Sequence, residues 1–314
     1  MRIFVAGATG ALGRPVVRRL TEVGHEVTGM TRSPAKRRLL EGLGARPVVA
    51  DALDAAAAQR AVSEARPDAV LNLLTALPPA GPTRARQLRA TNEVLQRGTA
   101  NLIRGVRAGG ARRMVAESFI GIYGFGTGEV VTEGAPLPRP DPNTGVGAGR
   151  AAMRSLEKQV LGAEGIEGIV LRYGAFYGPG VGTTEAWVQR LHRRKLPLPG
   201  GGPGIVPWIH IEDAAAATVA ALERGRPGEV YNVVDDQPAA LGEVAGSLAD
   251  AIGAPPPRSI PVWVARLLAP YAAASTTQTN LRVSNEKAKR ELEWAPVFPT
   301  YREGLKQVAA AYRP

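Results

Sequence analysis

The chain has 314 residues, three histidines, no cysteine and a formal net charge of +11. This length fits one large domain or a nucleotide-binding domain with a smaller lobe, and a hydrophobic content of 45% suffices for a full core. The lack of cysteine excludes disulfides, thiolate-bound metal clusters and a cysteine nucleophile, and with three histidines we predict no metal site.

The positive charge does not by itself indicate nucleic acid as a partner. Residues 1–47 hold about half of the excess, and the remaining charges are mixed, without a basic stripe interleaved with aromatic residues. The N-terminus has the pattern of a strand rather than a signal peptide, and no apolar run reaches the length of a membrane span. We therefore expect a cytoplasmic protein with a small-molecule substrate and with no nucleic-acid or membrane partner.

The first half alternates short apolar strands with helix-period segments. Strands are predicted near 2–6, 25–31, 46–50, 68–74 and 111–117, with helices near 11–23, 34–43, 54–65 and 84–108 between them. Strands separated by helices are typical of βαβ units, whose right-handed crossovers give a parallel sheet. The predicted fold class is α/β, a doubly wound parallel sheet of the Rossmann type.

The second half is less regular. A long loop is predicted over 124–146, followed by a helix at 148–163, a strand at 168–173, an amphipathic stretch at 183–195, a helix at 212–224 and a strand at 229–234. We assign 1–174 to the dinucleotide-binding domain, with 205–235 returning to it. Residues 175–204 and 236–314 are predicted to form a smaller substrate-binding lobe.

A glycine loop directly follows the first strand and opens the first helix. Its glycines, Gly7, Gly10 and Gly13, allow a tight turn and a close approach of the backbone to a pyrophosphate. The N-terminus of the following helix offers free N–H groups and a positive dipole end to the anion. The loop predicts dinucleotide binding through Gly7, Thr9, Gly10, Ala11, Leu12 and Gly13.

The end of the second strand bears on which dinucleotide binds. An acidic residue there would accept the adenosine ribose hydroxyls and select NAD, but the sequence is Met30-Thr31-Arg32-Ser33. Arg32 is suited to a 2′-phosphate, and Arg14 beside the glycine loop is a second candidate for the same phosphate. These residues favour NADP as the cofactor and leave NAD possible.

At several further positions the chain resembles the extended short-chain dehydrogenase/reductase superfamily, the NAD-dependent epimerase/dehydratase group. The similar segments are Ala50–Leu53, Thr91-Asn92, Gly98–Leu102, Ser118–Gly124, Leu171–Tyr173, Phe176–Gly180, Ile209–Ala214, Tyr231–Val233 and Ser284–Pro296. The resemblance implies cofactor contacts by Asp51, Ala52, Leu73 and Tyr173. It also implies a possible homodimer through the helices near 84–108 and 148–163.

The superfamily's catalytic pair, Tyr-x-x-x-Lys, is missing from this chain. None of the seven tyrosines is followed by lysine four residues later, and the family's register places the pair at Gly149 and Met153. Phe119 stands where the family has its assisting serine, with Ser118 one position earlier.

Tyr123, Ser118 and Tyr177 are the candidates to replace the missing proton donor, because each lies at or after a strand end on the expected ligand-binding edge. Arg150 or Arg154 on the following helix is a candidate for the missing cation.

The leading hypothesis is an NADP(H)-dependent oxidoreductase acting on a small organic carbonyl, alcohol or activated double bond without the Tyr-Lys pair. Two alternatives stay open. One is a non-redox isomerase, cyclase or dehydratase on the same fold, and the other is a non-catalytic dinucleotide sensor that binds a protein partner.

Overall fold

A seven-stranded parallel sheet forms the centre of the computed structural model, which describes residues 1–141 and 144–312. The strand order is β12-β7-β5-β4-β1-β2-β3, and neighbouring strands pair in parallel. The strands are β1 Arg2–Ala6, β2 Glu26–Thr31, β3 Arg46–Val49, β4 Ala69–Asn72, β5 Arg113–Phe119, β7 Glu167–Tyr173 and β12 Val230–Val233. The predicted fold class, a doubly wound parallel α/β sheet, is confirmed.

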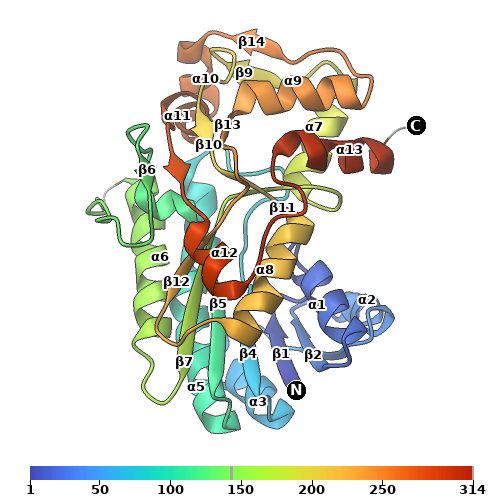
Figure 1. Cartoon of the computed structure of the whole chain (residues 1–314), viewed down its shortest axis with the longest axis vertical. Helices are drawn as coiled ribbons and strands as arrows, with labels where there is room; N and C mark the ends of the chain where they lie inside the picture. The colour runs from blue at the N-terminus through green and yellow to red at the C-terminus, as the bar shows by residue number, and fades with distance from the viewer. Residues whose placement is uncertain (142–143, 313–314) are drawn as a thin grey trace.

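Helices cover both faces of this sheet, as Figure 1 shows. One face carries α1 Gly13–Glu22 and α8 Ile211–Arg224, and the other carries α3 Ala55–Ala65, α5 Thr99–Gly109 and α6 Gly145–Leu161. Beside them lie η1 Pro34–Lys36, α2 Arg37–Gly42, η2 Ala85–Leu88, α4 Arg89–Glu93, η4 Ile120–Tyr123 and α12 Glu286–Leu292.

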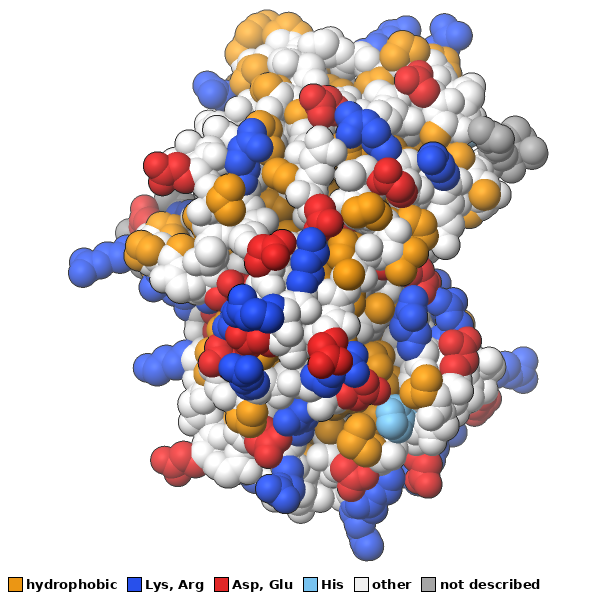
Figure 2. Space-filling view, in the orientation of Figure 1, with side chains coloured by type: hydrophobic (Ala, Val, Ile, Leu, Met, Phe, Trp, Pro, Cys, Tyr) orange, Lys and Arg blue, Asp and Glu red, His pale blue; other side chains and the backbone are white. Residues whose placement is uncertain are grey.

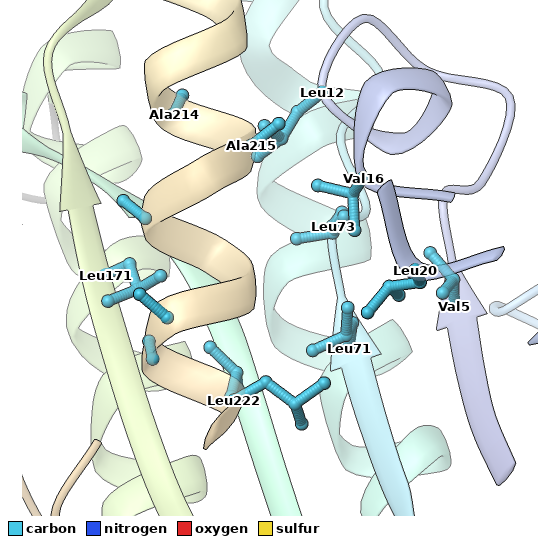
Figure 3. Close-up of a cluster of buried hydrophobic side chains, with 14 of the residues drawn as sticks. Val5, Leu12, Val16, Leu20, Leu71, Leu73, Leu171, Ala214, Ala215 and Leu222 are labelled. Carbon is cyan, nitrogen blue, oxygen red and sulfur yellow. The ribbon is translucent and has the colours of Figure 1, made fainter. Parts of the chain in front are cut away.

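The strands are apolar on both faces because both are covered. In β1, Ile3 and Val5 belong to the cluster under α1 and α8, whereas Phe4 and Ala6 belong to the cluster on the opposite face. Figure 3 shows the first of these clusters, in which Leu12, Val16 and Leu20 at α1 meet the side chains of α8 and of β4. The continuous apolar runs of the sequence therefore correspond to a fully buried sheet.

The remaining elements lie beyond the carboxyl ends of the strands, in the upper part of Figure 1. Four two-stranded sheets pair β10 with β13, β11 with β8, β14 with β9 and β15 with β6. The strands are β6 Val130–Val131, β8 Ala175–Tyr177, β9 Pro197–Pro199, β10 Ile205–Val206, β11 Trp208–His210, β13 Ala239–Ala240, β14 Arg258–Ile260 and β15 Arg282–Val283. The helices are α7 Gly182–His192, α9 Leu241–Ala251, α10 Val262–Leu268, α11 Pro270–Gln278 and α13 Tyr301–Tyr312.

The predicted division into two lobes remains a prediction. Within the stretch 205–235, α8 and β12 pack on or join the large sheet, whereas β10 and β11 pair with strands outside it. Residues 313 and 314 of the predicted substrate lobe lie outside the described residues.

Two segments differ from the expected secondary structure. The predicted helix at 84–108 is helical, but it contains the π-helical turn η3 Val94–Gly98, a local distortion often associated with function. The predicted loop at 124–146 contains the short strand β6, and residues 142–143 within it are not described.

No helix in the described part of the chain is long and apolar enough to cross a membrane. Figure 2 shows acidic and basic side chains interspersed over the face that it draws.

Candidate functional site

The glycine loop forms a cradle between β1 and the end of β4. Gly7 has a φ of 86°, and a Cβ at this position would overlap the carbonyl oxygen of Leu73. A Cβ on Gly13 would overlap the carbonyl oxygen of Gly7, and the Gly10 N–H donates to that same oxygen at 2.9 Å. The fold therefore requires glycine at both ends of the loop, and Gly10 between them is exposed.

The N-terminus of α1 fits an anion. No side chain caps it, and its first turn contains no acidic residue. Unsatisfied N–H groups at a helix N-terminus and the positive end of the helix dipole bind phosphate groups. The residues present thus fit the pyrophosphate of a dinucleotide.

Arg14 is engaged elsewhere in the structure. Its guanidinium donates to the carbonyl oxygen of Gly180 at 2.7 Å and to that of Gly10 at 3.4 Å. Gly180 N–H in turn donates to the hydroxyl of Tyr312, on the last helix. Through Nε and Nη2, Arg14 therefore ties the glycine loop to the segment after β8, and its contact with a 2′-phosphate stays a prediction.

Arg32 stands directly after β2 and is exposed. Among the described residues, no hydrogen bond or ion pair engages its guanidinium. Asp51 is also exposed and accepts from the N–H of Leu53 at 2.9 Å, while the carbonyl oxygen of buried Ala52 accepts from Asn101 at 2.8 Å. This edge of the sheet thus carries the guanidinium of Arg32, unpaired within the described part of the chain, and the carboxylate of Asp51, which is hydrogen-bonded within its own turn.

Two candidate proton donors, Ser118 and Tyr123, lie in a buried network at the end of β5. The Ser118 hydroxyl donates to Glu157 at 2.7 Å, and Glu157 receives two hydrogen bonds from Arg172 at 2.9 and 2.7 Å. Arg172 also donates to the Tyr123 hydroxyl, which donates to Asn232 at 2.8 Å. Burial raises the pKa of Tyr123. Both hydroxyl groups are already committed to protein partners.

The third candidate, Tyr177, is buried between β8, β11 and the chain near residue 300. Its hydroxyl donates to Asp235 at 3.0 Å, and burial, with the charge of Asp235, raises its pKa. Burial also raises the pKa of Asp235 to about 8. The structure therefore places Tyr177 in a buried pair with a carboxyl group and not on an open edge.

Tyr173, expected to contact the cofactor, is 1% exposed, and its hydroxyl hydrogen-bonds to Thr218 on α8 at 2.7 Å. Leu73 is likewise buried, and its N–H donates to the carbonyl oxygen of Ala6 at 2.9 Å, so the predicted cofactor contacts of both residues stay predictions.

Apolar side chains lie around the end of β5, near the positions where the resemblance would place the family's catalytic pair. Phe119 ends β5 with 41% of its surface exposed, and its ring lies against Gly121, which also lies near Met153 of α6. Gly149 is buried near Leu88.

The two α6 arginines proposed as a replacement cation are both half-buried. Arg154 donates to the carbonyl oxygens of Leu137 and Pro138 at 2.7 and 2.8 Å. The Arg150 guanidinium lies beside Gly124.

One ionisable residue of the site, Glu117, was not predicted. It lies in β5 next to Ser118, is half-buried, and burial raises the pKa of its carboxyl group to about 7. The available signal was its charge within the otherwise apolar run from Met114 to Ala116, since a buried parallel strand rarely carries an unpaired acid.

Comparison with protein families gives a match over residues 3–234 to the family described as NAD dependent epimerase/dehydratase. A relative from Streptomyces sp., a 3-diazoavenalumate denitrifying reductase, is 38% identical over 313 residues, which cover 97% of this chain and 99% of the relative. The chain belongs to the NAD dependent epimerase/dehydratase family. It is an NAD(P)-dependent enzyme of the oxidoreductase or epimerase type, and the alternative of a non-catalytic sensor is set aside.

The chain is also similar to proteins with other names. A 2-alkyl-3-oxoalkanoate reductase from Stenotrophomonas maltophilia is 30% identical over 267 residues, covering 81% of this chain and 77% of that protein. The crystal structure of a UDP-glucose 4-epimerase from Thermotoga maritima has a TM-score of 0.81 at 21% identity, and covers 99% of this chain and 98% of that one. A dTDP-glucose 4,6-dehydratase from Streptomyces venezuelae with NAD bound has the same TM-score at 23% identity, over 99% of this chain and 97% of that one. At these identities the solved structures establish the fold.

Proposed function

We propose that this enzyme is an NADP(H)-dependent reductase that replaces the diazo group of an aromatic carboxylate, reacting in its diazonium form, by hydrogen, with release of N2. The observation that carries the proposal is the reacting end of β5. There, exposed Phe119 stands in place of the family's serine, and the nearby hydroxyl groups of Ser118 and Tyr123 are committed to a buried network.

The number of protons that the substrate takes up differs between the two kinds of reduction. In carbonyl reduction the carbon gains a hydride and the oxygen gains a proton, so the site needs a positioned proton donor. At a carbon that bears a diazonium group, the incoming hydride forms the C–H bond, while the C–N bond breaks and its electron pair leaves with N2. The substrate takes up no proton, and the reaction can proceed without a Tyr-Lys pair.

The nicotinamide cofactor, when bound, supplies the hydride. The glycine loop and the N-terminus of α1 hold the pyrophosphate, and Arg32, free of protein partners, pairs with the 2′-phosphate of NADP. Phe119 offers a ring face to a planar aromatic substrate. The 38% identical reductase, named for a diazo carboxylate that it denitrifies, supports this substrate class.

The test is a substrate panel with purified protein and NADPH. We expect an aryl diazonium carboxylate labelled with nitrogen-15 to yield labelled N2 with stoichiometric NADPH oxidation, and a matched panel of aryl ketones to give no comparable turnover. Ketone turnover without N2 release would instead place the enzyme with the carbonyl reductases of the family.

Phe119→Ala tests the substrate surface. Loss of ring stacking is expected to raise KM for the aryl substrate by about tenfold. Val23→Ala, which truncates an exposed apolar side chain at the end of α1 away from the glycine loop, is the control and should leave KM unchanged. An equal response of the two variants would contradict a substrate-binding role for Phe119.

A further inference from the structure

Glu117 is an unpaired acid in the centre of the molecule. Among the described residues, no hydrogen bond or ion pair reaches its carboxyl group, and burial is the cause of its raised pKa. A half-buried polar group without a partner costs stability and needs an explanation. Unpaired ionisable groups of this kind gather where proteins bind ligands.

The strand register fixes the direction of the Glu117 side chain. Val115, two residues earlier in β5, packs in the core cluster under α1 and α8, and Leu171, the register partner of Glu117 on β7, packs in that same cluster. Because side chains alternate along a strand and register partners point to the same face, Glu117 points to the α1 and α8 face. This face also carries the start of α1, where the glycine loop ends.

The register also fixes its height in the sheet. Ala116 pairs with Asn72, so Glu117 lies one residue beyond the end of β4 and level with Leu73. The carbonyl oxygen of Leu73 is the group against which Gly7 packs. The carboxylate is therefore at the same edge and height as the glycine loop.

The strand order then assigns Glu117 to one half of a bound dinucleotide. The order reverses between β1 and β4, and a dinucleotide lies across that point. Its adenosine half lies over β1 and β2, beside Arg32, so its nicotinamide half lies over β4, β5 and β7. Glu117 is on the nicotinamide side.

The charge around Glu117 is unbalanced. Tyr173 on β7 is the titratable neighbour that interacts with it, and because burial raises the pKa of Tyr173, that phenol stays neutral at physiological pH. No lysine, arginine or histidine among the described residues contributes to the pKa of Glu117. The carboxylate thus has no protein cation to neutralise it.

We propose that Glu117 faces the nicotinamide ring of the bound cofactor and stabilises its oxidised, positively charged form. The reduced ring is neutral and becomes a cation as the hydride leaves, so a carboxylate beside it lowers the energy of the charge that develops during transfer. This inference rests on the nicotinamide cofactor in the proposed function and is independent of the substrate class.

The test compares the affinities of the oxidised and the reduced cofactor, without substrate. In Glu117→Gln we expect the oxidised form to bind about tenfold more weakly relative to the reduced form than it does in the wild type. Glu64→Gln, an exposed position on α3, is the charge-matched control and should leave the ratio unchanged. In the wild type, relative affinity for the oxidised form should also rise with pH as the carboxyl group ionises, and this pH dependence should be absent from Glu117→Gln.

Two outcomes would overturn the proposal. One is an unchanged affinity ratio in Glu117→Gln together with a pH-independent ratio in the wild type. The other is an equal loss of affinity for both forms, which would make Glu117 a hydrogen-bond partner of the cofactor without a preference for the oxidised ring. Failure of the diazo substrate assay would leave these binding results intact, so the two proposals fail separately.

Discussion

The two halves of the candidate cofactor site differ in how the sequence builds them. The adenosine side consists of a strand, a turn and a helix that follow one another, with Arg32 at the end of the next strand. The proposed reacting side is assembled from β5, α6, β7 and β12, and the bond between Tyr123 and Asn232 joins residues 109 positions apart. Local backbone geometry creates the first half, and long-range side-chain pairing creates the second.

The largest expected effect comes from breaking the buried pair on the reacting side. In Glu157→Gln the Arg172 guanidinium keeps its charge but loses its carboxylate partner, and both side chains are buried. We expect the free energy of unfolding to fall by about 3–5 kcal/mol, measured by urea denaturation. Glu93→Gln, which removes an exposed pair with Arg97, should cost no more than about 1 kcal/mol. An equal loss of unfolding free energy in the two variants would mean that the buried pair of Glu157 and Arg172 does not stabilise the fold more than an exposed pair does.

Glu117→Gln is expected to increase the free energy of unfolding, whereas Glu157→Gln decreases it. The folded state raises the pKa of this carboxyl group from 4.5 to about 7, so the group's contribution to stability is fully present below pH 4.5 and is lost as pH rises to about 7. At pH 8 the variant should therefore be more stable than the wild type by up to about 3 kcal/mol.

The control for that variant is its own behaviour at pH 4, where the advantage should vanish. Asp235, whose pKa burial also raises, is present in both proteins, so the difference between them isolates Glu117. A stability difference that does not change with pH would contradict an unpaired carboxylate at this position.

On the adenosine side, Arg32→Ala tests the cofactor preference. Loss of a charge-assisted pair with the 2′-phosphate should weaken NADPH binding by about 10- to 100-fold and leave NADH binding unchanged, measured by direct titration. Arg38→Ala, an exposed arginine on α2, should have no effect. Unchanged NADPH affinity, or tighter binding of NADH by both proteins, would refute the NADP preference.

The smallest effect is expected from Tyr123→Phe. Removing the hydroxyl leaves Arg172 and Asn232 each short of one hydrogen bond, which should cost about 1–2 kcal/mol of stability. Because we assign no proton transfer to this hydroxyl, kcat should fall by less than about tenfold. A proton donor would instead lose about 100-fold or more.

The same contrast explains which features the sequence could predict. The parallel sheet, its helices and the glycine loop follow from periodicity and from glycine spacing, which act over a few residues. The commitment of Ser118 and Tyr123 could not be read in this way, because Glu157 and Arg172 reach them from other elements. From their position at a strand end, the sequence predicts that the two hydroxyl groups are open to a ligand. In the structure they are buried and hydrogen-bonded to other side chains.

Arg14 and Glu117 are two further residues whose surroundings depend on contacts between distant parts of the sequence. The sequence placed Arg14 beside the glycine loop, but its partner, the carbonyl oxygen of Gly180, lies 166 residues away. Glu117 was visible as a charge within an apolar strand, yet its meaning depends on the register with β4 and β7, which the sequence alone does not reveal.

Isotope transfer tests the central claim, that the reacting half reduces its substrate without a protein proton donor. The reaction is run with an aryl diazonium carboxylate and NADPH deuterated at C4 in ordinary water, and again with unlabelled NADPH in deuterium oxide. We predict one deuterium at the carbon that lost nitrogen in the first experiment and none at that carbon in the second. Deuterium from the solvent at that carbon, or its absence when the cofactor is labelled, would contradict the account.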